Sequence, residues 1–171
     1  MPENQTDTCS CKDLTDLTVL DMDLESKKII DLLEEVKQRG ETHWWLSLKQ
    51  CKICSQYWLV ASEERQNDIY CLLKLDSETV KVILEQDTWP KEFETYEQLL
   101  QIGLNTGRKT EFVDPLNDGR SLHYTIEDIA KEHPGIPISR LAELLNLDIM
   151  TTVTIAKKVA GETGIQIDFN N

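Results

Sequence analysis

The sequence predicts an α+β protein, in which an N-terminal helix and a small antiparallel sheet precede a helical C-terminal part. Three patterns indicate this class. Apolar residues recur at helical spacing in residues 24–39, aromatic and apolar segments alternate with polar breaks over residues 44–73, and short helical patterns follow residue 125. A chain of 171 residues, 40% of them hydrophobic, can bury the core that this fold requires.

The N-terminal helix is predicted over residues 24–39. Ile29, Leu33 and Val36 recur at positions that share one face of a helix. A glycine follows the segment and favours a helix end there. Residues 1–8 are polar and are predicted to be disordered.

The sheet is predicted as a three-stranded antiparallel meander. Its strands are residues 44–48, 57–60 and 69–73, which are short and rich in aromatic and apolar side chains. A C-x-x-C pair lies in the first turn and gives it the sequence of a zinc knuckle. Residues 77–86 fit either a further strand or a short helix.

The C-terminal part is predicted as three short helices and a closing strand. Thr125, Pro137 and Asp148 each stand where a helix start is favoured. The apolar residues of 165–169 alternate with polar ones, as they do in a strand exposed on one side.

The predicted domain boundary lies in residues 104–124. This stretch is rich in glycine and in Asn and Asp, which favour turns. It would link an α+β domain of residues 1–103 to a helical subdomain of residues 125–171.

The net charge of −13, from 31 acidic and 18 basic residues, restricts the partners of the chain. Neutralising nucleic-acid phosphates requires Lys and Arg, so we expect no tight nucleic-acid binding; a basic protein partner suits this charge. The N-terminus lacks the basic start and apolar core of a signal peptide, and no apolar run is long enough to span a membrane. A cytoplasmic location is therefore expected.

Two closely spaced cysteine pairs carry the most specific chemical signal, Cys9 with Cys11 and Cys51 with Cys54. Zinc is commonly held by four thiolates in a tetrahedron, which two such pairs supply when they come together. The sequence predicts a structural zinc site at these four residues. Two alternatives stay open: a redox role for the C-x-x-C pair, and cysteines that act as small core residues.

No catalytic pattern is visible in the sequence. It has no Ser-His-Asp, Cys-His or H-E-x-x-H arrangement and no glycine-rich phosphate loop. A four-thiolate site would also be closed, with no coordination position for a substrate. A non-enzymatic protein is expected, and an enzyme whose site leaves no sequence signature is a third interpretation.

The candidate partner-binding residues are acidic side chains expected in exposed turns, together with aromatic side chains of a type enriched at interfaces. They are Glu63, Glu64, Asp68, Asp76, Glu78, Glu85, Trp44 and Trp45. Adjacent residues of a strand point to opposite faces. One of the two tryptophans is therefore expected in the core and the other on a partner-binding face.

One pattern extends over residues 44–103. It consists of Cys51-x-x-Cys54-x-Gln56-x-Trp58, Asp68-x-Tyr70, Trp89-Pro90 and Tyr96-Glu97-x-Leu99-Leu100. This pattern resembles small bacterial immunity proteins, which are encoded beside polymorphic toxins and neutralise them. The resemblance implies an acidic, cytoplasmic, non-enzymatic inhibitor that occludes the active site of a basic toxin such as a nuclease. It implies no fixed set of functional residues.

Residues 138–147 and the helix after Asp148 resemble a helix-turn-helix. That family reads DNA with the last helix, which here offers Lys157 and Lys158. From Thr125 onward, however, four basic residues face seven acidic ones. A packing or protein-binding role is favoured, and a zinc-containing helix-turn-helix transcription regulator is the alternative function.

Overall fold

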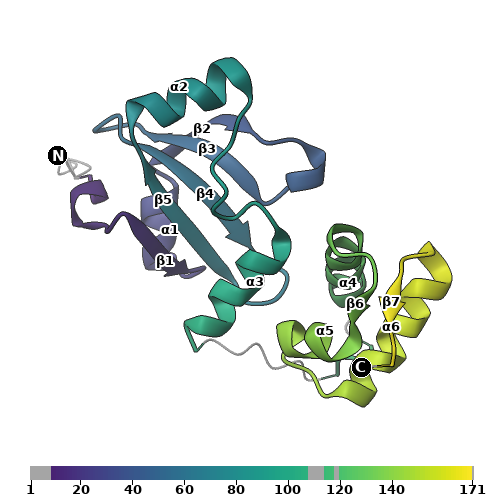
Figure 1. Ribbon diagram of the computed structural model, residues 1–171. Helices are drawn as coiled ribbons and strands as arrows, with labels where there is room; N and C mark the ends of the chain where they lie inside the picture. The colour runs from purple at the N-terminus through teal and green to yellow at the C-terminus, as the bar shows by residue number, and fades with distance from the viewer. Residues whose placement is uncertain (1–8, 108–113, 118–119, 171) are drawn as a thin grey trace. The chain divides into compact units, whose positions relative to one another are not determined.

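The computed structural model describes residues 9–107, 114–117 and 120–170. The predicted disorder of residues 1–8 lies outside these residues. Within them the chain forms six α-helices and a five-stranded antiparallel sheet, which confirms the α+β class (Figure 1).

The chain divides into two compact units. The sheet unit takes the described residues up to Ser62 and Asp68–Glu94, and the helical unit takes Glu63–Asn67 and the described residues from Thr95 onward. The division therefore falls at residues 94 and 95, and not within the expected linker of residues 104–124. A five-residue loop of the sheet also belongs to the helical unit.

The sheet has the strand order β1-β5-β4-β3-β2. Its strands are β1 (Leu17–Asp21), β2 (Leu33–Gln38), β3 (Leu46–Cys51), β4 (Tyr57–Glu63) and β5 (Ile69–Leu75). Strands β3, β4 and β5 form the predicted meander. The segments before it supply both edges, because β1 pairs with β5 and β2 pairs with β3.

The helix predicted over residues 24–39 is wrong in its second half. Helix α1 spans only Leu24–Ile30, and Leu33–Gln38 is the edge strand β2. Leu33 is buried, whereas Val36 lies at an irregularity in the pairing with β3 and is 41% exposed. Ladder hydrogen bonds to β3 thus override the helical preference of these residues.

The two faces of the sheet have different cores. Helix α2 (Ser77–Gln86) buries Val80 and Ile83, so residues 77–86 form the helix rather than the strand that the sequence also allowed. Figure 1 shows α2 and α1 on opposite sides of the sheet. The face away from α2 carries a smaller cluster: Cys11, Leu33, Cys51, Trp58, Val60 and Leu72, with Ile30 at the end of α1 packed against it.

The helical unit contains four helices and a two-stranded parallel ladder. They are α3 (Tyr96–Asn105), α4 (Ser121–Glu132), β6 (Ile136–Pro137), α5 (Ile138–Leu145), α6 (Ile149–Thr163) and β7 (Ile167–Asp168). The predicted closing strand is β7, which pairs with β6. Helix α4 starts at Ser121, so the predicted start at Thr125 is one turn late, and Thr125 is buried. No helix in the described part of the chain is long and apolar enough to cross a membrane.

Candidate metal centre

Two distant segments bring the four paired cysteines together. Cys9 precedes the short 3-10 helix η1 (Cys11–Asp13), which starts with Cys11. Cys51 is the last residue of β3, and Cys54 lies in the turn before β4. The four Sγ atoms all lie within 4.8 Å of one another, which confirms the predicted clustering.

The sulfur positions fit a tetrahedral metal site. The Sγ atom of Cys9 lies 3.2 Å from that of Cys54 and 3.5 Å from that of Cys51. Four sulfurs around zinc at 2.3 Å are about 3.8 Å apart, so shifts of a few tenths of an ångström to one ångström separate these positions from a tetrahedron. All five cysteines are thiols rather than disulfides, and the fifth, Cys71, is buried in β5 outside the cluster.

Backbone N–H groups favour a thiolate at Cys51, whereas burial raises the pKa of Cys9 and of Cys11. Burial alone would raise the pKa of the Cys51 thiol, but the backbone N–H groups of Cys54 and Ile53 and the neighbouring thiols lower it to about 7. The N–H of Cys11 donates to the Cys9 sulfur at 3.3 Å. Burial raises the pKa of Cys11, and the buried indole of Trp58 partly opposes this because it lies near that sulfur.

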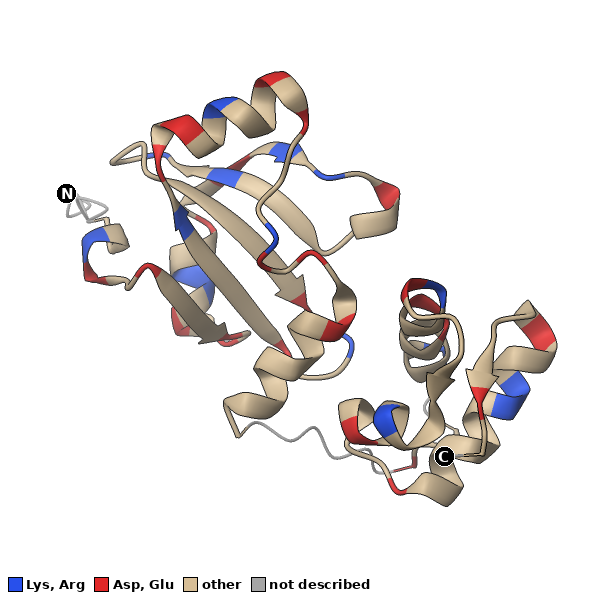
Figure 2. Ribbon diagram, viewed as in Figure 1, with Lys and Arg blue, Asp and Glu red and all other residues tan. Residues whose placement is uncertain are grey.

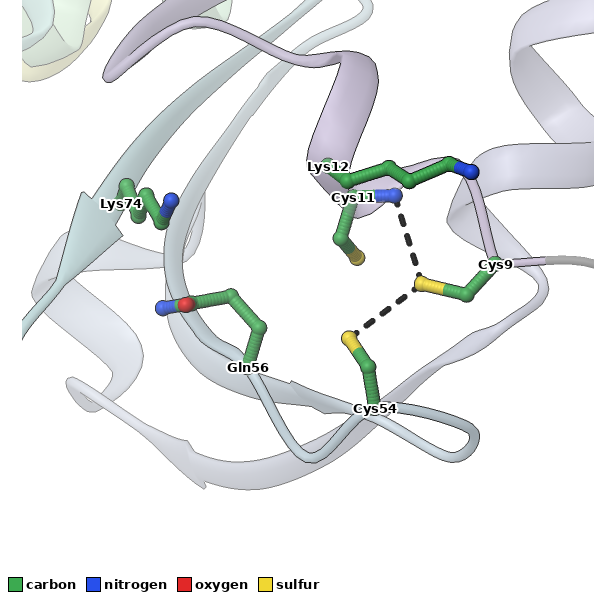
Figure 3. A pocket seen from close by; sticks show the side chains of 6 residues that line it. All are labelled: Cys9, Cys11, Lys12, Cys54, Gln56 and Lys74. Carbon is green, nitrogen blue, oxygen red and sulfur yellow. Dashed lines mark hydrogen bonds between the residues drawn. The ribbon is translucent and has the colours of Figure 1, made fainter.

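The four thiols differ in their access to solvent. Cys11 and Cys51 are buried, Cys9 is half-buried and Cys54 is exposed. The accessible side borders an open cavity of about 290 Å³. It is lined by Cys9, Cys11, Lys12, Cys54, Gln56 and Lys74 (Figure 3). The two lysines can offset the double negative charge of a zinc ion with four thiolates.

Glu63 is a buried structural residue, so its prediction as an exposed partner-binding residue is wrong. Its carboxylate accepts hydrogen bonds from the N–H groups of Arg65, Gln66 and Asn67 at 3.0, 3.0 and 2.6 Å. The Tyr96 hydroxyl donates a fourth bond at 2.7 Å. This burial and the Glu63 charge raise the pKa of Tyr96. Glu63 therefore holds the loop of residues 63–67 within the helical unit.

The other acidic candidates are exposed: Glu64, Asp68, Asp76, Glu78 and Glu85. One of them also has a structural role, since Asp76 caps α2 by accepting a hydrogen bond from the N–H of Thr79 at 2.8 Å. This interaction lowers the pKa of the Asp76 carboxyl. The remaining four residues stay candidates for a binding surface.

The two tryptophans divide as expected, but for a different reason. Trp45 is buried, and its indole N–H donates to the carbonyl of Phe93 at 3.1 Å, so it is wrong as a partner-binding candidate. Trp44 is half-buried and packs edge-on against Trp45. Both precede β3, in a turn after the short 3-10 helix η2 (Glu41–His43), so strand alternation does not apply to them.

Sequence reasoning missed the residues that surround the thiols. The sequence showed Trp58 only as part of a pattern over residues 44–103, and Lys74 comes from β5, twenty residues beyond the C-x-x-C pair. Only the alternation of β4, which puts Trp58 and Val60 on one face, could have placed the indole near the cysteines.

In comparisons with known proteins, no family model matches the chain, and neither a curated protein nor a solved structure is significantly similar to it.

Proposed function

We propose that this chain is a non-enzymatic protein-binding protein whose sheet unit is held together by a structural zinc ion. The observation that supports the metal is the cluster of four thiols within 4.8 Å. Sulfur ligands at tetrahedral positions favour zinc over the oxygen-seeking Mg²⁺ and Ca²⁺. The backbone N–H groups of Ile53 and Cys54 directed at Cys51 would stabilise a bound thiolate, which supports the proposed zinc knuckle.

The zinc ion would cross-link the N-terminal segment to the β3–β4 turn, on the sheet face that has the smaller core. Six buried residues form the core there, and two of them are the ligands Cys11 and Cys51. Such a small core stabilises the N-terminal segment weakly by hydrophobic burial alone. Metal binding supplies folding free energy in small domains of this kind.

Metal analysis of protein purified without added metal tests this proposal. We expect about one zinc per chain, and a cobalt-substituted protein with the absorption bands of tetrahedral sulfur coordination. Cys51→Ser should lose the metal, whereas Cys71→Ala, which removes a buried thiol outside the cluster, should retain it. Metal-free protein with all five thiols titratable would exclude the site.

The proposed activity is immunity, in which an acidic surface occludes the active site of a basic toxin domain. The net charge of −13 and the exposed carboxylates support it. On α2, Glu78 and Glu85 are seven residues apart and share one face of the helix. Figure 2 shows acidic residues towards both ends of α2 and a basic one between them, and Lys81 is the basic residue in the sequence of this helix.

Association kinetics with a basic toxin domain encoded next to this chain test the electrostatic mechanism. The on-rate should fall steeply with salt, because exposed charges are screened beyond about 8 Å at physiological ionic strength. Glu78→Gln with Glu85→Gln should slow association. The control, Glu25→Gln with Glu34→Gln, removes the same charge from exposed positions outside α2 and should have a smaller effect. Equal effects would exclude α2 as the binding face, and absence of binding would exclude immunity.

The alternative function is a helix-turn-helix transcription regulator. The specific observation for it is the sharp turn between α5 and α6, where Asn146 adopts a left-handed conformation with φ 51°. Lys157 and Lys158 are exposed on α6. We expect no tight binding of duplex DNA at physiological salt. A sequence-specific complex that is lost in Lys157→Gln with Lys158→Gln would favour the regulator instead.

A further inference from the structure

We propose that the metal centre is also an oxidation site, at which peroxide joins Cys9 to Cys54 and thereby replaces a metal cross-link by a disulfide between the same two segments. This inference depends on the proposed zinc site. Loss of zinc through oxidation should then differ in its structural effect from removal of zinc by a chelator.

The four sulfurs are unequally accessible, which selects where an oxidant reacts. Cys54 is exposed and Cys9 is half-buried, and both line the open cavity of about 290 Å³. Cys51 is only 2% exposed and is not part of that lining. Bound zinc would hold all four sulfurs as thiolates, so their exposure decides which one reacts with peroxide, and Cys54 is the first site of attack.

The distance between sulfurs selects the partner. The Cys9 Sγ atom lies 3.2 Å from the Cys54 Sγ atom, and Figure 3 shows the two side chains directed towards each other at the cavity. A disulfide needs an approach to about 2.05 Å, which is a further movement of about one ångström. The Cys9 thiolate is therefore in place to resolve an oxidised Cys54.

The chemistry is a two-electron oxidation of the protein by hydrogen peroxide. The Cys54 thiolate attacks one peroxide oxygen, the O–O bond breaks, and a sulfenic acid and one water form after protonation. The Cys9 thiolate then attacks the Cys54 sulfur and displaces the hydroxyl group, which leaves as a second water. One S–S bond forms, one peroxide is reduced, and the metal loses two of its four ligands.

The choice of this pair has a structural consequence. Cys9 belongs to the N-terminal segment, and Cys54, 45 residues later, belongs to the β3–β4 turn. A disulfide between them closes a loop that contains β1, α1, β2 and β3. A disulfide within either pair, Cys9–Cys11 or Cys51–Cys54, would leave the N-terminal segment untethered.

The tether matters for β1, which lies at an edge of the sheet. Within the described residues, β1 pairs along one side only, with β5. Its first residue, Leu17, is 49% exposed. When the cross-link is lost, β1 keeps its pairing with β5 but not its tether to the β3–β4 turn, and edge strands with little burial open readily. Oxidation would release the metal without releasing the strand.

The test compares three states of the full chain: zinc-loaded, reduced after chelation, and treated with one equivalent of hydrogen peroxide. Metal content is measured first, so that absence of zinc, which would overturn the proposed function, is recognised separately. In the oxidised state we expect released zinc, a decrease from five titratable thiols to three, and a Cys9–Cys54 peptide pair by mass spectrometry.

Amide hydrogen exchange of β1 gives the second readout. Protection should be similar in the zinc-loaded and oxidised states and at least about tenfold lower in the reduced, chelated state. Cys71→Ala should behave as the parent protein does. Cys9→Ser with Cys11→Ser leaves no thiol in the N-terminal segment to form a disulfide with the β3–β4 turn, so β1 of this variant should exchange fast after peroxide treatment. A zinc-containing protein that forms Cys51–Cys54 or Cys9–Cys11 first, or loses β1 protection on oxidation, would overturn the inference.

Discussion

Replacing Glu63 by Gln should destabilise the helical unit much more than the same change at its neighbour Glu64. Both carboxylate oxygens of Glu63 accept hydrogen bonds in a fully buried position. Oε1 accepts from two backbone N–H groups and the Tyr96 hydroxyl, and Oε2 accepts from the N–H of Asn67. In Glu63→Gln one of these two oxygens is replaced by an NH₂ group. The N–H or O–H donors that now bond to that oxygen would then face another donor.

The magnitude follows from the smaller of the two losses. If the amide oxygen takes the Oε1 position, only the Asn67 bond of 2.6 Å is lost. A hydrogen bond to a charged group contributes about 1.5–3 kcal/mol, and a buried donor without an acceptor costs about 1–3 kcal/mol. The two ranges describe partly the same loss and are not simply added, so Glu63→Gln should lower the free energy of unfolding by about 3 kcal/mol. Glu64→Gln, at an exposed position, should change it by less than about 0.5 kcal/mol.

Denaturant unfolding followed by circular dichroism and tryptophan fluorescence provides the assay. The two probes report on the helices and on the sheet unit, respectively, because all four tryptophans lie between residues 44 and 89. The effect of Glu63→Gln should be larger in the helical signal. Tyr96→Phe removes a single donor from the same carboxylate and should have a smaller effect than Glu63→Gln. Equal stability of Glu63→Gln and Glu64→Gln would refute the argument that the carboxylate holds the loop.

Three further predictions follow from packing and charge. Gly103→Ala should lower stability by about 1–3 kcal/mol in thermal denaturation, because the new Cβ would collide with the side-chain amide of Asn67. Gly161→Ala, whose Cβ would meet open space, should raise stability by up to about 1 kcal/mol. Trp45→Ala should cost about 3–5 kcal/mol in urea unfolding, and Trp44→Ala clearly less. Burial and then a neighbouring positive charge lower the pKa of His43, so an NMR titration should give a midpoint below 6.5. As the pH falls, His43 is protonated in the unfolded chain before it is protonated in the folded one. The contribution of neutral His43 to stability is therefore present above pH 6.5 and is lost as the pH falls towards the pKa of the folded state. A titration midpoint at or above 6.5 would contradict this prediction.

The cluster of four cysteines was predictable because its sequence signal is short and chemically specific. The C-x-x-C pair occupies one turn between two strands, and a turn of that length forces the two sulfurs to one side. The C-x-C pair, Cys9 with Cys11, supplies the other two sulfurs of the cluster. Its place was decided by the apolar neighbours of Cys11, which pack on the same sheet face as Cys51.

The role of Glu63 was not predictable from its surroundings in the sequence. It stands among polar residues at the end of a strand, where an exposed carboxylate is the common outcome. Its partner Tyr96 lies 33 residues later, in α3. The same pattern of charges therefore encodes both a buried anchor, Glu63, and an exposed acid, Glu64.

Local signals in the sequence determined the α+β class, the central meander, the helix starts at Pro137 and Asp148 and the identity of the four clustered thiols. Each strand, each helix start and each cysteine pair is a pattern of residues within about ten positions of one another, so periodicity, capping and cysteine spacing suffice to reveal it. The tertiary structure decided that residues 33–38 form a strand, that the loop of residues 63–67 joins the helical unit, and that Cys54 rather than Cys51 faces the cavity. These outcomes depend on which distant segment pairs with a given residue or covers it. Burial and backbone hydrogen bonding compete at such positions, and only the packing of the whole chain decides between them.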